Sequence, residues 1–221
     1  MKISSLRLAL LIALSTMVAT FFMGHKAPPQ ICKPVSERTS EVGCWIMANT
    51  TLGLLPKEPI FWHLYTYPTR AEADAAKGPR GTVVESLGKV WLFTIDVEGW
   101  RSSSGERVAG IGPLPVVADV KYSSQYMEAI FTPGMTAPPH RHAGPEAWYT
   151  VTGQTCLETS EGYMIGQSGG PAVIVRGGLP MHLTATGKET RRALVLILHD
   201  STQPPTTPAK DWVPVGLCVK E

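Results

Sequence analysis

The sequence predicts an all-β protein with many turns, and two observations lead to this class. The 221-residue chain contains 19 prolines and 21 glycines, residues that interrupt helices and favour turns. Between them lie many short runs rich in β-branched residues, which are typical of strands. The length suits one well-buried domain, and only loosely two. No internal repeat is visible, so a duplicated domain is not favoured.

The first residues have the composition of a targeting segment. Lys2 and Arg7 precede an apolar run from Leu8 to Gly24. A basic region followed by an apolar one is typical of a secretory signal, and residues 1–27 are predicted to form one. The length of the run also approaches that of a membrane span, so a retained membrane anchor is the alternative. The protein is therefore expected to be secreted or periplasmic, or else anchored to a membrane.

The cysteines and the net charge bear on the compartment and on the partners. Four cysteines are compatible with an oxidising space, and the sequence leaves their pairing open: Cys32, Cys44, Cys156 and Cys218. The spacing of these cysteines does not resemble that of a zinc site. The net charge is +2, and the basic residues are scattered rather than clustered. Nucleic acid is therefore not an expected partner.

The chain that follows the leader begins with polar residues and then becomes apolar and aromatic. Residues 25–43 are polar and contain proline, so we expect a linker or a loosely attached arm. Residues 59–66 alternate in character and predict a strand. The segment 69–78 is the clearest helix, because Thr69 can cap its start, alanines fill it and Gly78 ends it.

Several short strands are expected after this helix. Residues 82–85 and 90–95 predict a hairpin. The continuous apolar run 193–198 predicts a buried strand, and further strands are expected at 108–117 and 125–132. The alternation in 125–132 does not reveal which face is buried. Glu128 is therefore either a pocket acid or a solvated strand residue, and the second interpretation is the simpler one.

The stretch from Gly134 to Gly153 carries two histidines and a carboxylate within seven residues. Its prolines and glycines exclude a helix, so an extended chain is expected. Side chains alternate along such a chain, which puts His140 and His142 on one face about 6.6 Å apart. Glu146 has the same parity, and a turn at residues 144–145 can fold it back toward them. Imidazole and carboxylate together suit Zn, Fe, Mn, Ni or Cu.

This stretch resembles the first motif of the cupin family. The shared spacing is G-x5-H-x-H-x3-E-x6-G, carried here by Gly134, His140, His142, Glu146 and Gly153. Residues 170–182 are similar to the second cupin motif, with Arg176 where the family has proline. Arg176 could meet an anionic substrate, although a solvated loop arginine is the plainer interpretation. The resemblance covers residues 115–200 and implies an antiparallel β-barrel, also called a double-stranded β-helix or jelly roll.

The resemblance also implies a set of site residues. His182 would be the fourth metal ligand beside His140, His142 and Glu146, and Glu146 could also accept a proton as a catalytic base. Strand parity then brings Trp148 and Thr150 to the face of Glu146, and Thr184 to the face of His182. Both predicted strands thus have one polar and one apolar face. We expect the polar faces to line a ligand pocket, with these three residues as its walls.

The domain organisation and the function follow as expectations. An N-terminal β-rich extension at 28–80 would pack on a barrel at 81–205, followed by a C-terminal tail at 206–221. Cupins include dioxygenases, isomerases, decarboxylases and lyases as well as non-catalytic binding proteins, so the fold alone does not choose. The first hypothesis is a metal-dependent protein that acts like a dioxygenase on a small phenolic or carbonyl molecule. The alternative is a non-catalytic cupin that binds a carbohydrate or another small polar ligand. A homodimer, with the aromatic N-terminal segment at its interface, is compatible with both.

Overall fold

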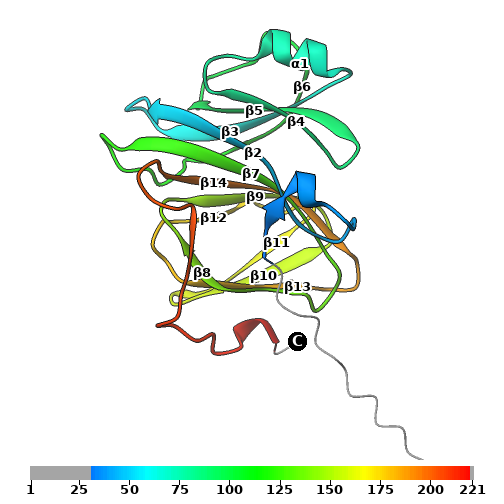
Figure 1. Ribbon diagram of the computed structural model, residues 1–221, viewed down its shortest axis with the longest axis vertical. Coiled ribbons are helices and arrows are strands. Elements are labelled where there is room, and N and C mark those ends of the chain that lie inside the picture. Colours follow the sequence, from blue (N-terminus) through cyan, green and yellow to red (C-terminus); the bar gives the residue numbers. More distant parts are fainter. Residues whose placement is uncertain (1–30, 220–221) are drawn as a thin grey trace, which may run out of the picture.

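The computed structural model describes residues 31–219, and these residues form three β-sheets stacked in layers (Figure 1). The all-β prediction is confirmed, with one α-helix in the described part of the chain. The predicted signal or anchor at residues 1–27 lies outside the described residues. Residues 31–219 contain no helix that is both long and apolar enough to cross a membrane.

Two facing antiparallel sheets make up the lower part of the molecule in Figure 1. Their eight strands are β7 (Lys121–Phe131), β8 (Thr136–His142), β9 (Glu146–Thr152), β10 (Gln154–Thr159), β11 (Gly162–Gln167), β12 (Val173–Val175), β13 (Met181–Thr186) and β14 (Arg191–Asp200). The first sheet has the order β7-β14-β9-β12 and the second the order β11-β10-β13-β8. The chain thus passes repeatedly from one sheet to the other, which is the jelly-roll arrangement.

Additional strands extend both sheets. In the first sheet, β2 (Gly43–Leu54) pairs with β7, and β1 (Lys33–Pro34) pairs in parallel with β2. A 3-10 turn, η1 (Val35–Glu37), separates β1 from β2. In the second sheet, β15 (Thr206–Pro208) pairs with β8. The outermost jelly-roll strands on these two sides are therefore covered rather than left as open sheet edges.

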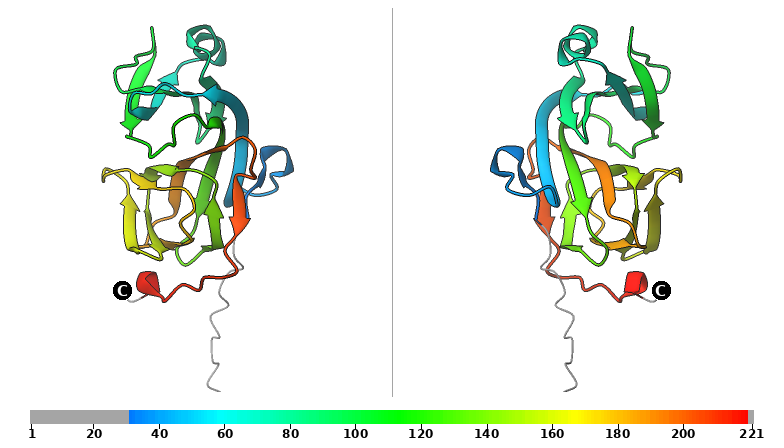
Figure 2. Two further views of the ribbon diagram at one scale, coloured as in Figure 1. Left: turned by 90° about the vertical axis from the view of Figure 1, so that its left-hand side faces the viewer. Right: turned by 90° about the vertical axis from the view of Figure 1, so that its right-hand side faces the viewer.

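A third sheet, formed by the N-terminal half of the chain, packs on the outer face of the first one (Figure 2). It has the order β4-β5-β3-β6, with bounds Ile60–Tyr67 for β3, Gly81–Ser86 for β4, Lys89–Val97 for β5 and Glu106–Ile111 for β6. Helix α1 (Arg70–Ala76) covers its other face. The side chain of Thr69 accepts a hydrogen bond from the amide of Glu72, as expected for the cap of this helix.

Strand β14 lies between two hydrophobic cores, and its sequence follows from that position. Val195 and Ile197 point into the core between the two jelly-roll sheets. Leu194, Leu196 and Leu198 point the other way, into the core against the N-terminal sheet. A strand buried on both faces needs apolar residues at every position, which explains why no alternation is visible in this run.

The sheets do not follow the expected division of the chain at residue 80. Strands β4, β5 and β6 come after that point but pair with β3 in the N-terminal sheet. Strand β2 comes before it but pairs with β7 of the jelly roll. Pairing between distant strands decides membership of a sheet, and this pairing is invisible in local composition.

Glu128 points away from the jelly-roll interior and joins three parts of the fold. Glu128 is 1% exposed, so it is not a solvated strand residue, and it lines a depression outside the jelly-roll cavity. One carboxylate oxygen accepts hydrogen bonds from the hydroxyl of Ser86, at 2.6 Å, and from the amide of Leu87, at 3.0 Å. The other lies 2.6 Å from the guanidinium of Arg38 in the N-terminal arm.

Glu128→Gln is expected to lower the free energy of unfolding by about 1–3 kcal/mol, because it removes the negative charge of a buried carboxylate that makes three contacts. Chemical denaturation of both proteins measures the difference. Glu85→Gln is the matched control, since Glu85 is 62% exposed at its side chain and pairs with Arg70 on the surface. That control should change stability by no more than about 0.5 kcal/mol. Equal effects of the two variants would contradict the bridging role of Glu128.

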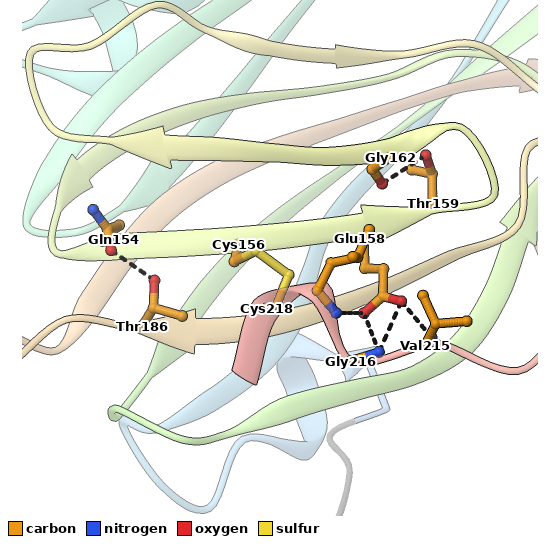
Figure 3. Close-up of a disulfide and its surroundings, with 10 residues drawn as sticks. Gln154, Cys156, Glu158, Thr159, Gly162, Thr186, Val215, Gly216 and Cys218 are labelled. Atoms are coloured by element: carbon orange, nitrogen blue, oxygen red, sulfur yellow. Dashed lines mark hydrogen bonds between the residues drawn. A yellow bond between two sulfur atoms is a disulfide. The ribbon is translucent and has the colours of Figure 1, made fainter. Parts of the chain in front are cut away.

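The C-terminal segment crosses the outer face of the second sheet and is fixed there in two ways (Figure 3). Cys156 of β10 forms a disulfide with Cys218, in the 3-10 turn η2 (Leu217–Val219). The carboxylate of Glu158 accepts hydrogen bonds from the backbone amides of Val215, Gly216 and Leu217. A second disulfide joins Cys32 and Cys44. We call residues 213–219 the C-terminal strap.

Candidate metal and ligand site

The cavity between the two jelly-roll sheets has a volume of about 540 Å³ and contains His140, His142 and Glu146. Both histidines come from the end of β8, and Glu146 is the first residue of β9. The turn between the two strands requires glycine at position 144, because a Cβ atom there would lie 2.0 Å from the carbonyl oxygen of Leu198. This close backbone contact sets Glu146 opposite the histidines.

The two histidine rings are oriented by backbone carbonyl groups. His140 Nδ1 lies 2.7 Å from the carbonyl oxygen of Pro138, and His142 Nδ1 lies 2.9 Å from that of Pro205. A carbonyl group only accepts hydrogen bonds, so each Nδ1 carries the proton and donates it. In a neutral ring the lone pair is then on Nε2. Second-sphere contacts of this kind orient the histidine ligands of metal sites.

Burial determines the protonation of these groups. It lowers the pKa of His142 to about 4 and also lowers the pKa of His140, so both rings are neutral at pH 7. Burial raises the pKa of Glu146, while His140, Trp148 and Arg191 act in the opposite direction. Neutral imidazoles are the forms that bind divalent metals, whereas Glu146 binds one only after its carboxyl group has lost its proton.

The donor atoms lie close together at one end of the cavity. The His140 and His142 ring centroids are 4.8 Å apart, and His142 Nε2 is 3.6 Å from Glu146 Oε2. Both of these atoms are buried and have no hydrogen-bond partner among residues 31–219. Within the same residues, no three His, Cys, Asp or Glu side chains meet at metal-binding distance. The nitrogen and oxygen atoms that face each other without partners are nevertheless of the kinds that bind divalent transition metals.

The structure does not bring His182 to this group. Its neighbours Met181 and Leu183 belong to the core between the sheets, so strand alternation puts His182 on the outer face of β13. There it pairs in register with Glu158, beneath the C-terminal strap. The apolar face of this strand, and not the predicted polar one, is therefore turned toward the cavity.

The three predicted pocket residues have different positions. Trp148 lines the cavity and is 1% exposed. Thr184 shares the outer face of β13 with His182 and does not line the cavity. Thr150 has the parity of Trp148 but lies two residues farther along β9, also outside the cavity wall. Arg176 pairs with Glu161 on the surface, as expected for a solvated loop arginine.

Arg191 is the cavity residue that was missed in the sequence. It is the first residue of β14, it is fully buried, and it lines the cavity on the face of Val195 and Ile197. The sequence could have indicated this position, because Arg191 is an even number of residues from Val195 and Ile197 and so lies on the same face of the strand. Gly153 positions it, because a Cβ atom there would lie 2.7 Å from the Arg191 Cα atom, and its φ of +69° favours glycine.

A larger depression of about 1180 Å³ lies beside Glu128, at the junction with the N-terminal sheet. It is open to solvent, and its buried carboxylate is already bonded to Ser86, Leu87 and Arg38. The smaller cavity combines enclosure with unpartnered donor atoms. It is therefore the stronger candidate for a functional site.

The strand order around the cavity identifies the fold. Strands β7 to β14 are divided between the two sheets as in the eight-stranded jelly rolls, a group that includes the cupins, and the His-His-Glu spacing lies on β8 and β9. The fold is that of a cupin. The N-terminal sheet, α1 and the C-terminal strap are additions to the cupin core.

Several solved structures are similar to about two fifths of this chain. A cupin-like protein from Thermotoga maritima matches 41% of this chain and 65% of its own, with 16% identity and a TM-score of 0.35. Oxalate oxidase in complex with glycolate matches 40% and 46%, with 22% identity and a TM-score of 0.32. L-ribose isomerase from Cellulomonas parahominis matches 38% and 51%, with 13% identity and a TM-score of 0.32. The chain thus spans less than two thirds of each of these proteins. The sequence matches no protein-family model and no curated protein.

Proposed function

We propose that this protein is an exported cupin that binds a divalent transition metal with His140, His142 and Glu146. The observation that carries the proposal is the orientation of the two rings. Each histidine donates its Nδ1–H to a backbone carbonyl group, which leaves Nε2 free at the cavity end that holds Glu146. The two disulfides support export, because such bonds persist in oxidising compartments.

The protein is further proposed to act on a small oxygenated molecule, in the manner of a dioxygenase. Three protein ligands leave positions open for a substrate, as in the sites with two histidines and one carboxylate. When bound, the metal would supply a Lewis acid and a template. Glu146 can hold or accept a proton, because burial keeps its pKa raised. The apolar walls, including Trp148, exclude water from the reacting molecule.

Elemental analysis of the purified protein tests the metal site. The wild type is expected to hold about one equivalent of metal, and the His140→Ala/His142→Ala double variant none, because two of three ligands are lost. His182→Ala is the matched control and should keep the metal, since His182 lies on the outer face of β13. Retention of stoichiometric metal by the double variant would refute the site.

A non-catalytic binding protein is the second candidate. It is favoured by the position of His182, which leaves the site without the fourth ligand expected for a cupin. Ligand-induced thermal stabilisation that survives treatment with a chelator would support this function. Turnover that requires metal would exclude it. The mainly apolar cavity wall fits a carbohydrate less well than an aromatic or aliphatic ligand.

A further inference from the structure

Arg191 is a buried cation for which residues 31–219 provide no hydrogen-bond acceptor. The residue is 0% exposed, and it lines the cavity beside Trp148. None of its three guanidinium nitrogens has a hydrogen-bond partner among residues 31–219. Buried charges in proteins are normally paired and hydrogen-bonded, because desolvation is otherwise unfavourable. Five N–H donors therefore lie in an enclosed space without acceptors.

Aromatic rings hold the guanidinium in place but do not satisfy its donors. Its central carbon lies 5.0 Å from the ring centroid of Trp148 and 5.9 Å from that of Phe131. Such cation–π contacts attract the charge electrostatically. They do not replace the two parallel hydrogen bonds that a guanidinium makes with a carboxylate. The side chain is thus fixed in position while its hydrogen-bonding capacity stays free.

Glu146 does not act as the missing partner. It is close enough to favour the charged form of Arg191, but its Oε2 atom makes no hydrogen bond with any described residue. Burial lowers the pKa of Arg191 to about 10, so the group is still a cation at neutral pH. If Glu146 serves as a metal ligand, its negative charge is shared with the ion. The cavity then has an excess of positive charge, which favours an anionic ligand.

The walls between these polar ends are apolar. They include Phe131 and Leu183 as well as Met127, Val195 and Ile197. A ligand that fills this space needs an apolar body with one anionic end. A carboxylate fits better than a phosphate, because one guanidinium can neutralise a single negative charge and offers one planar pair of N–H donors. A phosphate dianion would bury a second charge among apolar side chains.

We propose that Arg191 binds the carboxylate of a small, largely apolar acid, whose other end reaches the cavity region of His140, His142 and Glu146. This inference names the substrate class for the proposed function and rests on it in that respect. The binding step itself depends on Arg191 and on the cavity walls. It therefore takes place with or without a metal ion.

Calorimetric titration of the chelator-treated full chain with benzoate and with benzamide tests the proposal. The two probes have nearly the same shape, and only benzoate carries the negative charge. Benzoate is expected to bind with a dissociation constant of about 0.1–1 mM, as for other ligands of this size. Benzamide should bind at least about 10-fold more weakly, because it lacks the charge-assisted contact. Inorganic phosphate should bind more weakly than benzoate.

Two variants and a matched control assign the effect to the guanidinium. Arg191→Met should weaken benzoate binding at least about 10-fold and remove the preference over benzamide. The benzoate affinity of Arg191→Lys should lie between those of Arg191→Met and the wild type. Lysine keeps the positive charge but lacks the planar arrangement of N–H donors. Arg192→Met makes the same change one residue along, at a partly exposed side chain that pairs with Glu41, and should bind benzoate like the wild type.

Several results would overturn the proposal. For the wild type, these are equal affinities for benzoate and benzamide, no benzoate binding at all, or tighter binding of phosphate than of benzoate. For Arg191→Met, it is benzoate binding as tight as that of the wild type. Should Arg191→Met fail to fold, the benzoate and benzamide titrations of the wild type and of Arg191→Lys decide. The His140→Ala/His142→Ala variant separates the proposed metal site from the proposed carboxylate binding. It is expected to lose metal and to keep benzoate binding. A wild type without metal that still prefers benzoate would refute the proposed function alone.

Discussion

Arg191→Met is expected to raise the free energy of unfolding by about 1–4 kcal/mol, as when apolar residues replace other buried charges. The wild-type guanidinium is fully buried and has no hydrogen-bond acceptor within residues 31–219, whereas methionine has a similar reach and no charge. A residue retained at the expense of stability is typical of a functional site. Urea denaturation of the ligand-free protein measures the change.

Arg192→Met is the control for this stability prediction too. Its side chain is 35% exposed and pairs with Glu41 on the surface, so its replacement should change stability by less than about 1 kcal/mol. A marked loss of stability in Arg191→Met would show that the guanidinium supports the folded state. The low stability of the wild-type site would then no longer be an argument for a ligand.

Removal of the disulfide between Cys156 and Cys218 is expected to destabilise the protein by about 4 kcal/mol. The bond closes a loop with a sequence separation of 62 residues, and the loss of chain entropy in the unfolded state grows with this length. Serine at both positions keeps the size of the side chains nearly unchanged. Guanidinium denaturation of the double variant gives the difference in free energy.

The second disulfide provides the comparison. Cys32 and Cys44 are separated by 12 residues, so serine at both positions should cost about 3 kcal/mol. If the 32/44 variant loses more stability than the 156/218 variant, loop length is not the dominant effect. In the 156/218 variant, the hydrogen bonds from the strap to Glu158 are the contacts that remain to hold it on β10.

The sequence predicted most of the local structure correctly, because these features depend on neighbouring residues. Thr69 caps the helix that follows it, and the run 193–198 is a buried strand. The two histidines share one face of β8, with ring centroids 4.8 Å apart. Side-chain alternation within one strand was sufficient for these predictions.

The predictions that failed depended on segments far away in the chain. Thr184 and His182 were expected in the cavity, but β13 turns its other face, with Met181 and Leu183, toward the facing sheet. Glu128 has its partners in the N-terminal arm and in the turn after β4, which are remote in sequence. The sequence pattern of a strand shows that its two faces differ. It does not show which of the two is covered by another part of the chain.

The position of β14 between two cores has a consequence for attempts to shorten the protein. Its odd-numbered residues, such as Val195, enclose the cavity, while Leu194 and Leu196 are covered by the N-terminal sheet. A fragment reduced to the jelly roll would expose this second set of leucines to water, and such surfaces cause self-association. We therefore expect the additional layer to be needed for the solubility of the jelly roll that contains the cavity.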